Sequence, residues 1–134
     1  MPGYSATPLA KKLGIKDGFK AVLLEVPADV QKELKEEFAG CSVPVGARAD
    51  IDFALLFSKS GAHLNKEFSK VERRLAPAGM LWIGWPKKSS GVPTDLDENK
   101  VREIGLDAGL VDVKVCAITD VWSGLKFVRR IKDR

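Results

Sequence analysis

Three continuous hydrophobic runs are the most informative pattern in this chain. They cover residues 19–26 ("FKAVLLEV"), 51–57 ("IDFALLF") and 80–85 ("MLWIGW"). Runs of this length with few polar positions are typical of strands that are buried on both faces, as in a parallel sheet. Pro27 closes the first run. The pattern therefore predicts three central strands.

Between and after these runs, hydrophobic residues recur at intervals of three and four, which is the spacing of one helix face. The segments are 28–40, 60–75 and 95–108, and the spaced residues are Val30, Leu34, Phe38, Leu64, Phe68, Val71, Leu75, Val101, Ile104 and Ala108. Ser60 stands at a helix-cap position, and Asp95 with Glu98 has the spacing of a capping box. Gly105 lies inside the last segment, where glycine costs up to ~1 kcal/mol relative to alanine. Close packing against the sheet is the expected compensation.

Two shorter segments lie outside this framework. Thr7 and Pro8 predict the start of a helix that Thr7 caps and that Gly14 ends. Residues 41–46 ("CSVPVG") predict a short strand. Because Pro44 has no N–H to donate, this strand belongs at a sheet edge.

The C-terminal part alternates between hydrophobic and polar positions. Segments 110–118 and 124–131 are joined by a turn and predict an antiparallel hairpin. The residues expected to share one side are Val111, Val113, Val115 and Ala117 in the first strand, and Leu125, Phe127 and Arg129 in the second.

The order of these elements predicts an α/β fold. Strands that alternate with helices favour a parallel sheet covered on both faces, with right-handed crossovers. We therefore expect a three-layer α/β/α sandwich whose mostly parallel sheet ends in a C-terminal antiparallel hairpin. A length of 134 residues predicts one domain, 1–134.

Composition narrows the classes of protein. A hydrophobic content of 45% and a charged content of 30% are ordinary for a globular chain. No hydrophobic run approaches the ~20 residues that a membrane-spanning helix needs. The N-terminus has no hydrophobic signal segment, so we expect a cytoplasmic protein with no membrane partner. In that compartment, Cys41 and Cys116 are expected to be reduced thiols.

The net charge of +4 is concentrated near the C-terminus, in "RRIKDR". The basic residues there are Arg129, Arg130, Lys132 and Arg134. A solvated chain end is the expected role. Binding of nucleic acid through this tail is a weaker alternative, because no aromatic residues are interleaved with the charges.

The chain resembles the class I methyltransferases over nearly its whole length. "LGIKDGFKAVLLEV" is similar to the lead-in to their first strand, "DIDFALLF" to their fourth strand, and "RRLAPAGMLWIGW" to the turn into their fifth. The terminal hairpin is similar to their strands six and seven. The resemblance implies a Rossmann-like fold with one strand–helix unit missing, which leaves residues 41–46 at the edge.

A closer resemblance is to a family of small uncharacterised bacterial proteins. The segments that carry it are "GYSATPLAKKLGIK", "MLWIGWPKK", "SGVPTDL", "VREIGLDAGLVDVKVCAI" and "WSGLKF". This resemblance implies the same fold and no particular activity.

The turn after the first strand departs from the methyltransferase pattern. Those enzymes have a glycine-rich turn there, and glycines allow a cofactor to approach the backbone closely. Here the stretch is "LLEVPADV", with Pro27 in the turn and no glycine before Gly40. We therefore expect no cofactor, with S-adenosylmethionine as the alternative if the turn binds it differently.

Other catalytic arrangements have little support. The chain has one histidine, His63, for which a solvent-facing structural role is expected. The spacing indicates neither a Ser–His–Asp triad nor a Cys–His pair. Zinc sites need several Cys or His residues at characteristic spacings, and we expect no metal. Asp50 and Asp52, which flank the start of a strand, are expected to be structural.

Candidate binding residues lie where the strands end, because open α/β sheets bind ligands beyond the carboxyl ends of their strands. The predicted ligand-binding residues are Glu25, Pro27, Ser58, Trp85, Lys87, Lys88, Ser89, Ser90 and Gly91. The two lysines supply positive charge, the serines and the backbone near Gly91 supply hydrogen bonds, and Trp85 a flat apolar wall. The alternative is that the lysines are solvated and Trp85 belongs to the core. Tyr4, Ser5 and Trp122 are further residues that can reach this edge.

These observations favour a degenerate methyltransferase-like domain that binds a small anionic ligand or a protein partner. One alternative is an S-adenosylmethionine-dependent methyltransferase with an altered cofactor loop, and another is a nucleic-acid-binding module. A homo-oligomer is possible if a second subunit covers the edge left by the missing unit.

Overall fold

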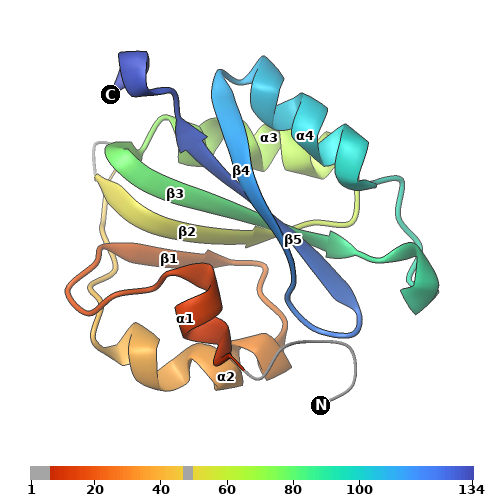
Figure 1. Cartoon of the computed structure of the whole chain (residues 1–134), viewed down its shortest axis with the longest axis horizontal. Helices are drawn as coiled ribbons and strands as arrows, with labels where there is room; N and C mark the ends of the chain where they lie inside the picture. Colours follow the sequence, from red (N-terminus) through yellow and green to blue (C-terminus); the bar gives the residue numbers. More distant parts are fainter. Residues whose placement is uncertain (1–6, 47–49) are drawn as a thin grey trace.

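The computed structural model describes residues 7–46 and 50–134 (Figure 1). The elements in chain order are α1 (Leu9–Leu13), β1 (Ala21–Leu24), α2 (Ala28–Ala39), β2 (Ile51–Phe57), α3 (Gly61–Glu72), β3 (Leu75–Pro86), the 3-10 helix η1 (Lys88–Ser90), α4 (Glu98–Asp107), β4 (Leu110–Ala117), β5 (Trp122–Arg129) and the 3-10 helix η2 (Ile131–Asp133). Helices and strands alternate as the hydrophobic pattern predicts.

The sheet of the described residues has five strands in the order β1-β2-β3-β5-β4. β1, β2 and β3 are parallel, and β5 runs antiparallel to both β3 and β4. β4 therefore points in the same direction as the first three strands, and only β5 runs against them. The mostly parallel sheet with its C-terminal hairpin is confirmed.

Two hydrophobic clusters lie on opposite faces of this sheet. Along β2, Phe53, Leu55 and Phe57 belong to the cluster on the α1/α2 side, whereas Ala54 and Leu56 belong to the cluster on the α3/α4 side. All five are at most 2% exposed, because helices cover both faces (Figure 1). The three-layer sandwich and the doubly buried central strand are confirmed.

The buried indole of Trp82 connects β3 to the first helix. Its Nε1–H donates to the carbonyl oxygen of Leu13 at 2.8 Å. Gly14 follows with φ +89°, a left-handed helix end that glycine adopts readily. The predicted end of α1 is therefore confirmed. The predicted Thr7 cap is wrong, because the cap position is Pro8 and no side chain there accepts a hydrogen bond.

The predicted edge strand at 41–46 is wrong. It is reduced to one parallel bridge between Lys20 and Ser42, so β1 is the edge strand of the described sheet. Pro44 has no N–H with which to continue the pairing. Beside it, Val43 and Val45 are 60% and 92% exposed.

β3 begins earlier than the sequence predicts. Residues 76–79 ("APAG"), which separate the predicted helix at 60–75 from the predicted strand at 80–85, lie within it. Leu75 pairs with Ile51, and the register then shifts before Phe53 pairs with Met80. This irregularity accommodates Pro77 in a strand, and Gly79 packs so closely on the Ile51 carbonyl that a Cβ there would collide with it.

One side of the terminal hairpin also differs from prediction. Val113 and Val115, expected to share one hydrophobic side of their strand, are 55% and 48% exposed. β4 is an edge strand, and its register shifts between Asp112 and Lys114. In β5, Leu125 and Phe127 are buried. Arg129, on the same side, donates to Glu72 Oε1 at 2.8 Å.

The helix caps are only partly those predicted. Ser60 caps α3 as expected, by accepting a hydrogen bond from the His63 N–H at 3.1 Å. The cap of α4 is Asp97, which accepts from the Lys100 N–H at 2.8 Å, so the predicted capping box at Asp95 is wrong. Asp95 instead accepts from the N–H of Gly61, the first residue of α3, at 2.8 Å. Two aspartates in one loop therefore serve two different helices.

The close packing expected at Gly105 is confirmed, and it generates the first prediction. A Cβ at this position would overlap the ring of Phe127. We expect Gly105→Ala to lower the free energy of unfolding by about 1–3 kcal/mol because of overpacking. Urea denaturation measures this, with the exposed helix residue changed in Glu103→Ala as the control. A gain of ~1 kcal/mol, the value of helix propensity alone, would contradict the packing argument.

Candidate functional site

A pocket of about 280 Å³ opens at the carboxyl edge of the sheet. It lies where β1 and β2 end, with the start of β5 beside them. The residues that line it are Glu25, Phe57, Ser58, Lys59, Ser60, His63 and Trp122. This is the edge at which the strand-end argument places a ligand.

Glu25 occupies an unusual backbone conformation in the wall of this pocket. Its φ is +57°, and it is the only non-glycine residue with positive φ in the described part of the chain. A left-handed conformation costs ~1–2 kcal/mol for a residue with a Cβ. The turn consists only of Glu25, the buried Val26 and Pro27 before α2 begins. Strain of this kind concentrates at functional sites.

Ser58 and His63 meet on the other side of the pocket. Ser58 directly follows β2 and is 4% exposed, and its Oγ lies 2.7 Å from Nδ1 of His63. The Ser60 cap positions the first turn of α3, which brings His63 back towards the strand end. His63 is therefore half-buried and bonded to Ser58 rather than fully solvent-facing, and its structural role stays a prediction. Among the described residues, no carboxylate bonds to the imidazole, so the pair is not a Ser–His–Asp triad.

Two aromatic rings supply the apolar part of the pocket. The ring centroids of Phe57 and Trp122 are 4.8 Å apart at an interplanar angle of 66°, an edge-to-face contact. Phe57 is 2% exposed and Trp122 is half-buried. The Trp122 ring is therefore the one that offers contact area to a ligand.

The loop between β3 and α4 supports the pocket from outside. Thr94 Oγ1 donates to the carbonyl oxygen of Lys59 at 2.6 Å. Asp95 binds the Gly61 N–H, as described above, and also lies 3.7 Å from Lys100 Nζ. Lys59, which lines the pocket, and Gly61, the first residue of α3, are thus connected to this loop.

Of the predicted ligand-binding residues, Glu25 and Ser58 line the pocket, while Pro27 precedes α2 and does not. Residues 87–91 form a separate turn that projects beyond the sheet (Figure 1). There the Lys87 N–H donates to the Val121 carbonyl at 2.8 Å, and Ser90 Oγ donates to the Lys87 carbonyl at 2.6 Å. Lys88, Ser89 and Gly91 are exposed. The structure does not bring this turn together with residues 25–27 around the pocket.

Trp85 does not form a wall of the pocket. It is 4% exposed and packs in the α3/α4 cluster. Trp82 lies in the same strand, β3, but its side chain faces the opposite cluster. The alternative role as a core residue is correct. Tyr4 and Ser5 lie outside the described residues.

Sequence reasoning missed Phe57 and His63 as binding residues. The signal was present in "FSKSGAH", 57–63. A strand end followed by a capped helix places the next three or four side chains at the same edge. His63 was assigned to the helix surface because its contact with Ser58 depends on how sharply this turn folds back.

The two cysteines have no features of a nucleophile. Both are free thiols. Burial raises the pKa of the Cys116 thiol, and desolvation likewise raises the pKa of Cys41. A raised pKa means less thiolate at neutral pH, which is the reactive form. Neither cysteine lines the pocket.

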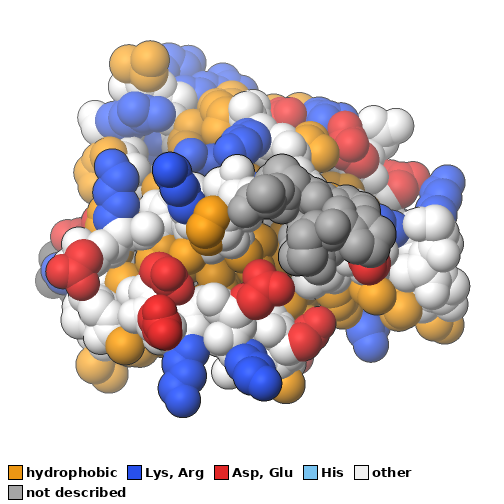
Figure 2. All heavy atoms as spheres, turned by 60° about the horizontal axis from the view of Figure 1, so that its bottom comes forward, with side chains coloured by type: hydrophobic (Ala, Val, Ile, Leu, Met, Phe, Trp, Pro, Cys, Tyr) orange, Lys and Arg blue, Asp and Glu red, His pale blue; other side chains and the backbone are white. Residues whose placement is uncertain are grey.

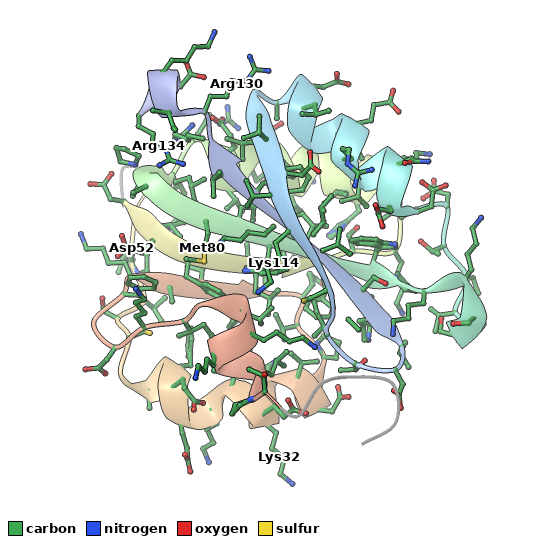
Figure 3. All side chains as sticks on the ribbon, in the orientation of Figure 1. Lys32, Asp52, Met80, Lys114, Arg130 and Arg134 are labelled. Carbon is green, nitrogen blue, oxygen red and sulfur yellow. The ribbon has the colours of Figure 1, made fainter. Side chains whose placement is uncertain are left out.

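Asp52 has the structural role expected of it. Its Oδ2 accepts from the Lys20 N–H at 2.9 Å, at the amino ends of β1 and β2 (Figure 3). It therefore lies at the opposite end of the strands from the pocket.

The basic residues near the C-terminus are not all available for a partner. Arg129 donates to the Glu72 side chain and to the carbonyl oxygens of Glu72 and Leu75. Arg130 and Arg134 extend from the end of the chain, far from the pocket (Figure 3).

On the molecular face that contains α2, acidic and basic side chains are interspersed (Figure 2). In the described residues, no helix is long and apolar enough to cross a membrane.

Several S-adenosylmethionine-dependent methyltransferases have a similar structure. One from Aquifex aeolicus has a TM-score of 0.58 at 16% sequence identity, covering 89% of this chain and 86% of that one. Magnesium protoporphyrin IX methyltransferase from Synechocystis, with bound SAH, has a TM-score of 0.59 at 10% identity, covering 91% and 78%. Fibrillarin from Aeropyrum pernix, with natively bound S-adenosylmethionine, has 0.56 at 12%, covering 90% and 73%.

These similarities show the fold: the chain has the class I methyltransferase fold, as its sequence resemblance implied. No protein-family model matches the chain, and no curated protein sequence does. At identities of 10–16% the comparison concerns the backbone alone.

The turn after β1 does not fit S-adenosylmethionine in the way that a glycine-rich turn does. Close approach of a cofactor to the backbone requires positions without a Cβ. Glu25 instead places a side chain in the pocket wall, and Val26 and Pro27 complete the turn. The pocket of about 280 Å³ is also slightly smaller than the ~300–1,000 Å³ typical of ligand pockets.

The strain at Glu25 generates the second prediction. We expect Glu25→Gly to keep or raise the free energy of unfolding, by up to about 1 kcal/mol, because relief of the positive φ outweighs the added flexibility of glycine. Glu25→Val should lower it by about 1 kcal/mol or more, because a branched residue tolerates this conformation least. Chemical denaturation of both variants measures the difference. A loss of stability in Glu25→Gly comparable to that in Glu25→Val would show that the backbone conformation is not strained.

Proposed function

We propose that this chain is a methyltransferase-like domain that binds a small polar ligand in the pocket between the ends of β1 and β2, and that it does not transfer methyl groups. The observation that carries the proposal is that Glu25, a residue with a Cβ, lines the pocket on a strained turn without glycine. The scaffold places a pocket at the expected edge, but the turn is built for a different ligand.

The lining of the pocket supports a binding role. It combines one buried hydroxyl, Ser58, with one half-buried aromatic ring, Trp122, and a few charged groups around them. Ligand pockets typically have this composition, with apolar walls and a small number of polar groups that orient the ligand. The volume suits a molecule smaller than a nucleoside cofactor. The small anionic ligand that the sequence predicts at Lys87 and Lys88 has less support, because that turn does not line the pocket.

A second candidate is an S-adenosylmethionine-dependent methyltransferase with an altered cofactor loop. The similar folds of S-adenosylmethionine-dependent methyltransferases favour it. In that case the cofactor would lie against Glu25 and Trp122 without the close backbone approach that glycines permit. The ligand titration described next distinguishes the two candidates.

The third prediction is the pattern of ligand binding. Isotope-labelled protein is titrated with S-adenosylmethionine, nucleotides and sugar phosphates, and amide chemical shifts locate the site. We expect a small polar ligand to shift signals of Glu25, Ser58 and Trp122, and S-adenosylmethionine to bind no more tightly than millimolar. Trp122→Ala should weaken the binding because it removes the exposed aromatic surface. Val113→Ala, a change of an exposed residue on β4, is the matched control.

Two outcomes would decide against the proposal. Tight, saturable binding of S-adenosylmethionine, with transfer of its methyl group to an acceptor, would establish the second candidate. Ligand-induced shifts confined to residues 87–91 would move the site to the turn that the sequence predicted.

A further inference from the structure

The hydrogen bond between Ser58 and His63 determines which groups the pocket offers to a ligand. Ser58 is the one buried polar residue in the described part of the chain. A buried hydroxyl requires a hydrogen-bond partner. Here that partner is the imidazole of a residue that lines the pocket, at 2.7 Å. The direction of this bond therefore decides whether the ring presents a donor or an acceptor.

Hydroxyl donors form bonds of about 2.7–2.8 Å to oxygen, whereas N–H donors bond at about 2.9–3.0 Å. A second acceptor for the Ser58 hydroxyl is the Ser60 carbonyl oxygen, which lies at 3.1 Å from Ser58 Oγ and also accepts from the Leu64 N–H at 2.9 Å. The contact with His63 is the shorter of the two, so we take it as the bond that the hydroxyl donates. This choice places the proton of the neutral ring on Nε2. Within the described residues, Nε2–H has no protein acceptor.

The lining of the pocket holds groups of both signs. Lys59 and His63 supply N–H donors. The first N–H of α3, on Gly61, is occupied by Asp95, whose other oxygen lies 3.7 Å from Lys100 Nζ. Glu25 is the acidic group in the lining itself. The lining can therefore both donate hydrogen bonds to a ligand and accept them from it.

We infer that the pocket binds a small hydroxylated anion. Its phosphate or carboxylate group accepts hydrogen bonds from His63 Nε2–H and the Lys59 ammonium, its hydroxyl group donates to Glu25, and its carbon chain lies against Trp122. Bonds to charged groups are the strong ones in such a site. A bare anion would be repelled by the Glu25 carboxylate, and the hydroxyl converts that repulsion into a hydrogen bond. This inference rests on the proposed function, because it uses the same pocket, and adds the class of ligand.

The single histidine allows a direct test on the whole 134-residue chain. Nitrogen-15 shifts of the imidazole distinguish a protonated Nε2 from a protonated Nδ1. We expect the neutral ring to carry its proton on Nε2, and Ser58→Ala to shift the Nδ1 signal because the hydrogen bond to it is lost. A neutral ring protonated mainly on Nδ1 in the unaltered protein would overturn the assignment.

Ligand binding is tested with four probes: glycerol 3-phosphate, glycerate, inorganic phosphate and glycerol. We expect glycerol 3-phosphate or glycerate to shift the His63 ring signals saturably. Inorganic phosphate and glycerol should bind at least about tenfold more weakly, because each makes only part of the contacts. Lys59→Ala should weaken the best probe about tenfold, the effect of losing one charged hydrogen bond. Lys87→Ala, a lysine at the same sheet edge that does not line the pocket, should leave binding unchanged.

The outcomes separate this inference from the function on which it rests. If a nucleotide or S-adenosylmethionine occupies the pocket and none of the four probes does, the ligand class is wrong and a binding role of the pocket stands. If Lys87→Ala abolishes probe binding and Lys59→Ala does not, the anion binds at residues 87–91 and the inference fails. If no compound shifts residues of the pocket, both the inference and the proposed function fail.

Discussion

The burial of β2 on both faces is the constraint on which the rest of this structure depends. Each of its side chains from Phe53 to Phe57 enters one of two hydrophobic clusters, and the strand is paired on both edges. A strand in this position cannot slip by one residue, because a slip would exchange the two sets of side chains between differently shaped cores. The position of its last residue, and of Ser58 after it, is therefore tightly defined. The burial of β2 in the core therefore also fixes the positions of the pocket residues at the end of this strand.

The turn after β1 is the part of the structure on which the proposed change of ligand depends. The strand and the helix that flank the turn occupy positions of the class I methyltransferase fold. Within the turn, Glu25 and not a glycine lines the pocket. The positive φ of Glu25 strains the backbone of the turn, and a glycine at this position would relieve the strain. A side chain retained at such a cost points to a role in the pocket rather than in the fold.

Much of the fold was predictable from the sequence, because continuous hydrophobic runs and regular helical spacing are local signals. The bounds of β2 and the Ser60 cap follow from them directly. The errors arose where a nonlocal partner decides the outcome. Asp95 has the spacing of a cap for α4, yet it binds Gly61 of a different helix. Val113 alternates like a buried residue, yet its strand lies at an edge.

The site was predictable to a smaller degree for the same reason. Glu25 and Ser58 were found because the ends of parallel strands meet at one edge. His63 was missed because its role depends on a hydrogen bond across a turn, and Trp85 was misassigned because two tryptophans in one strand, Trp82 and Trp85, face opposite cores. The lysine-rich turn has the composition of a binding loop, but composition does not determine the direction in which a turn projects.

The loop that follows that turn has a further consequence for how such a pocket can diversify. Thr94 and Asp95 hold the carbonyl of Lys59 and the N–H of Gly61, so a loop outside the pocket sets the position of one of its walls. Insertions or deletions in the loop would shift Lys59 relative to Glu25 without altering any residue that touches a ligand. The spacing between Lys59 and Glu25 can thus be tuned through a segment that does not itself line the pocket, so that closely related chains with identical pocket residues can differ in the length of ligand they accept.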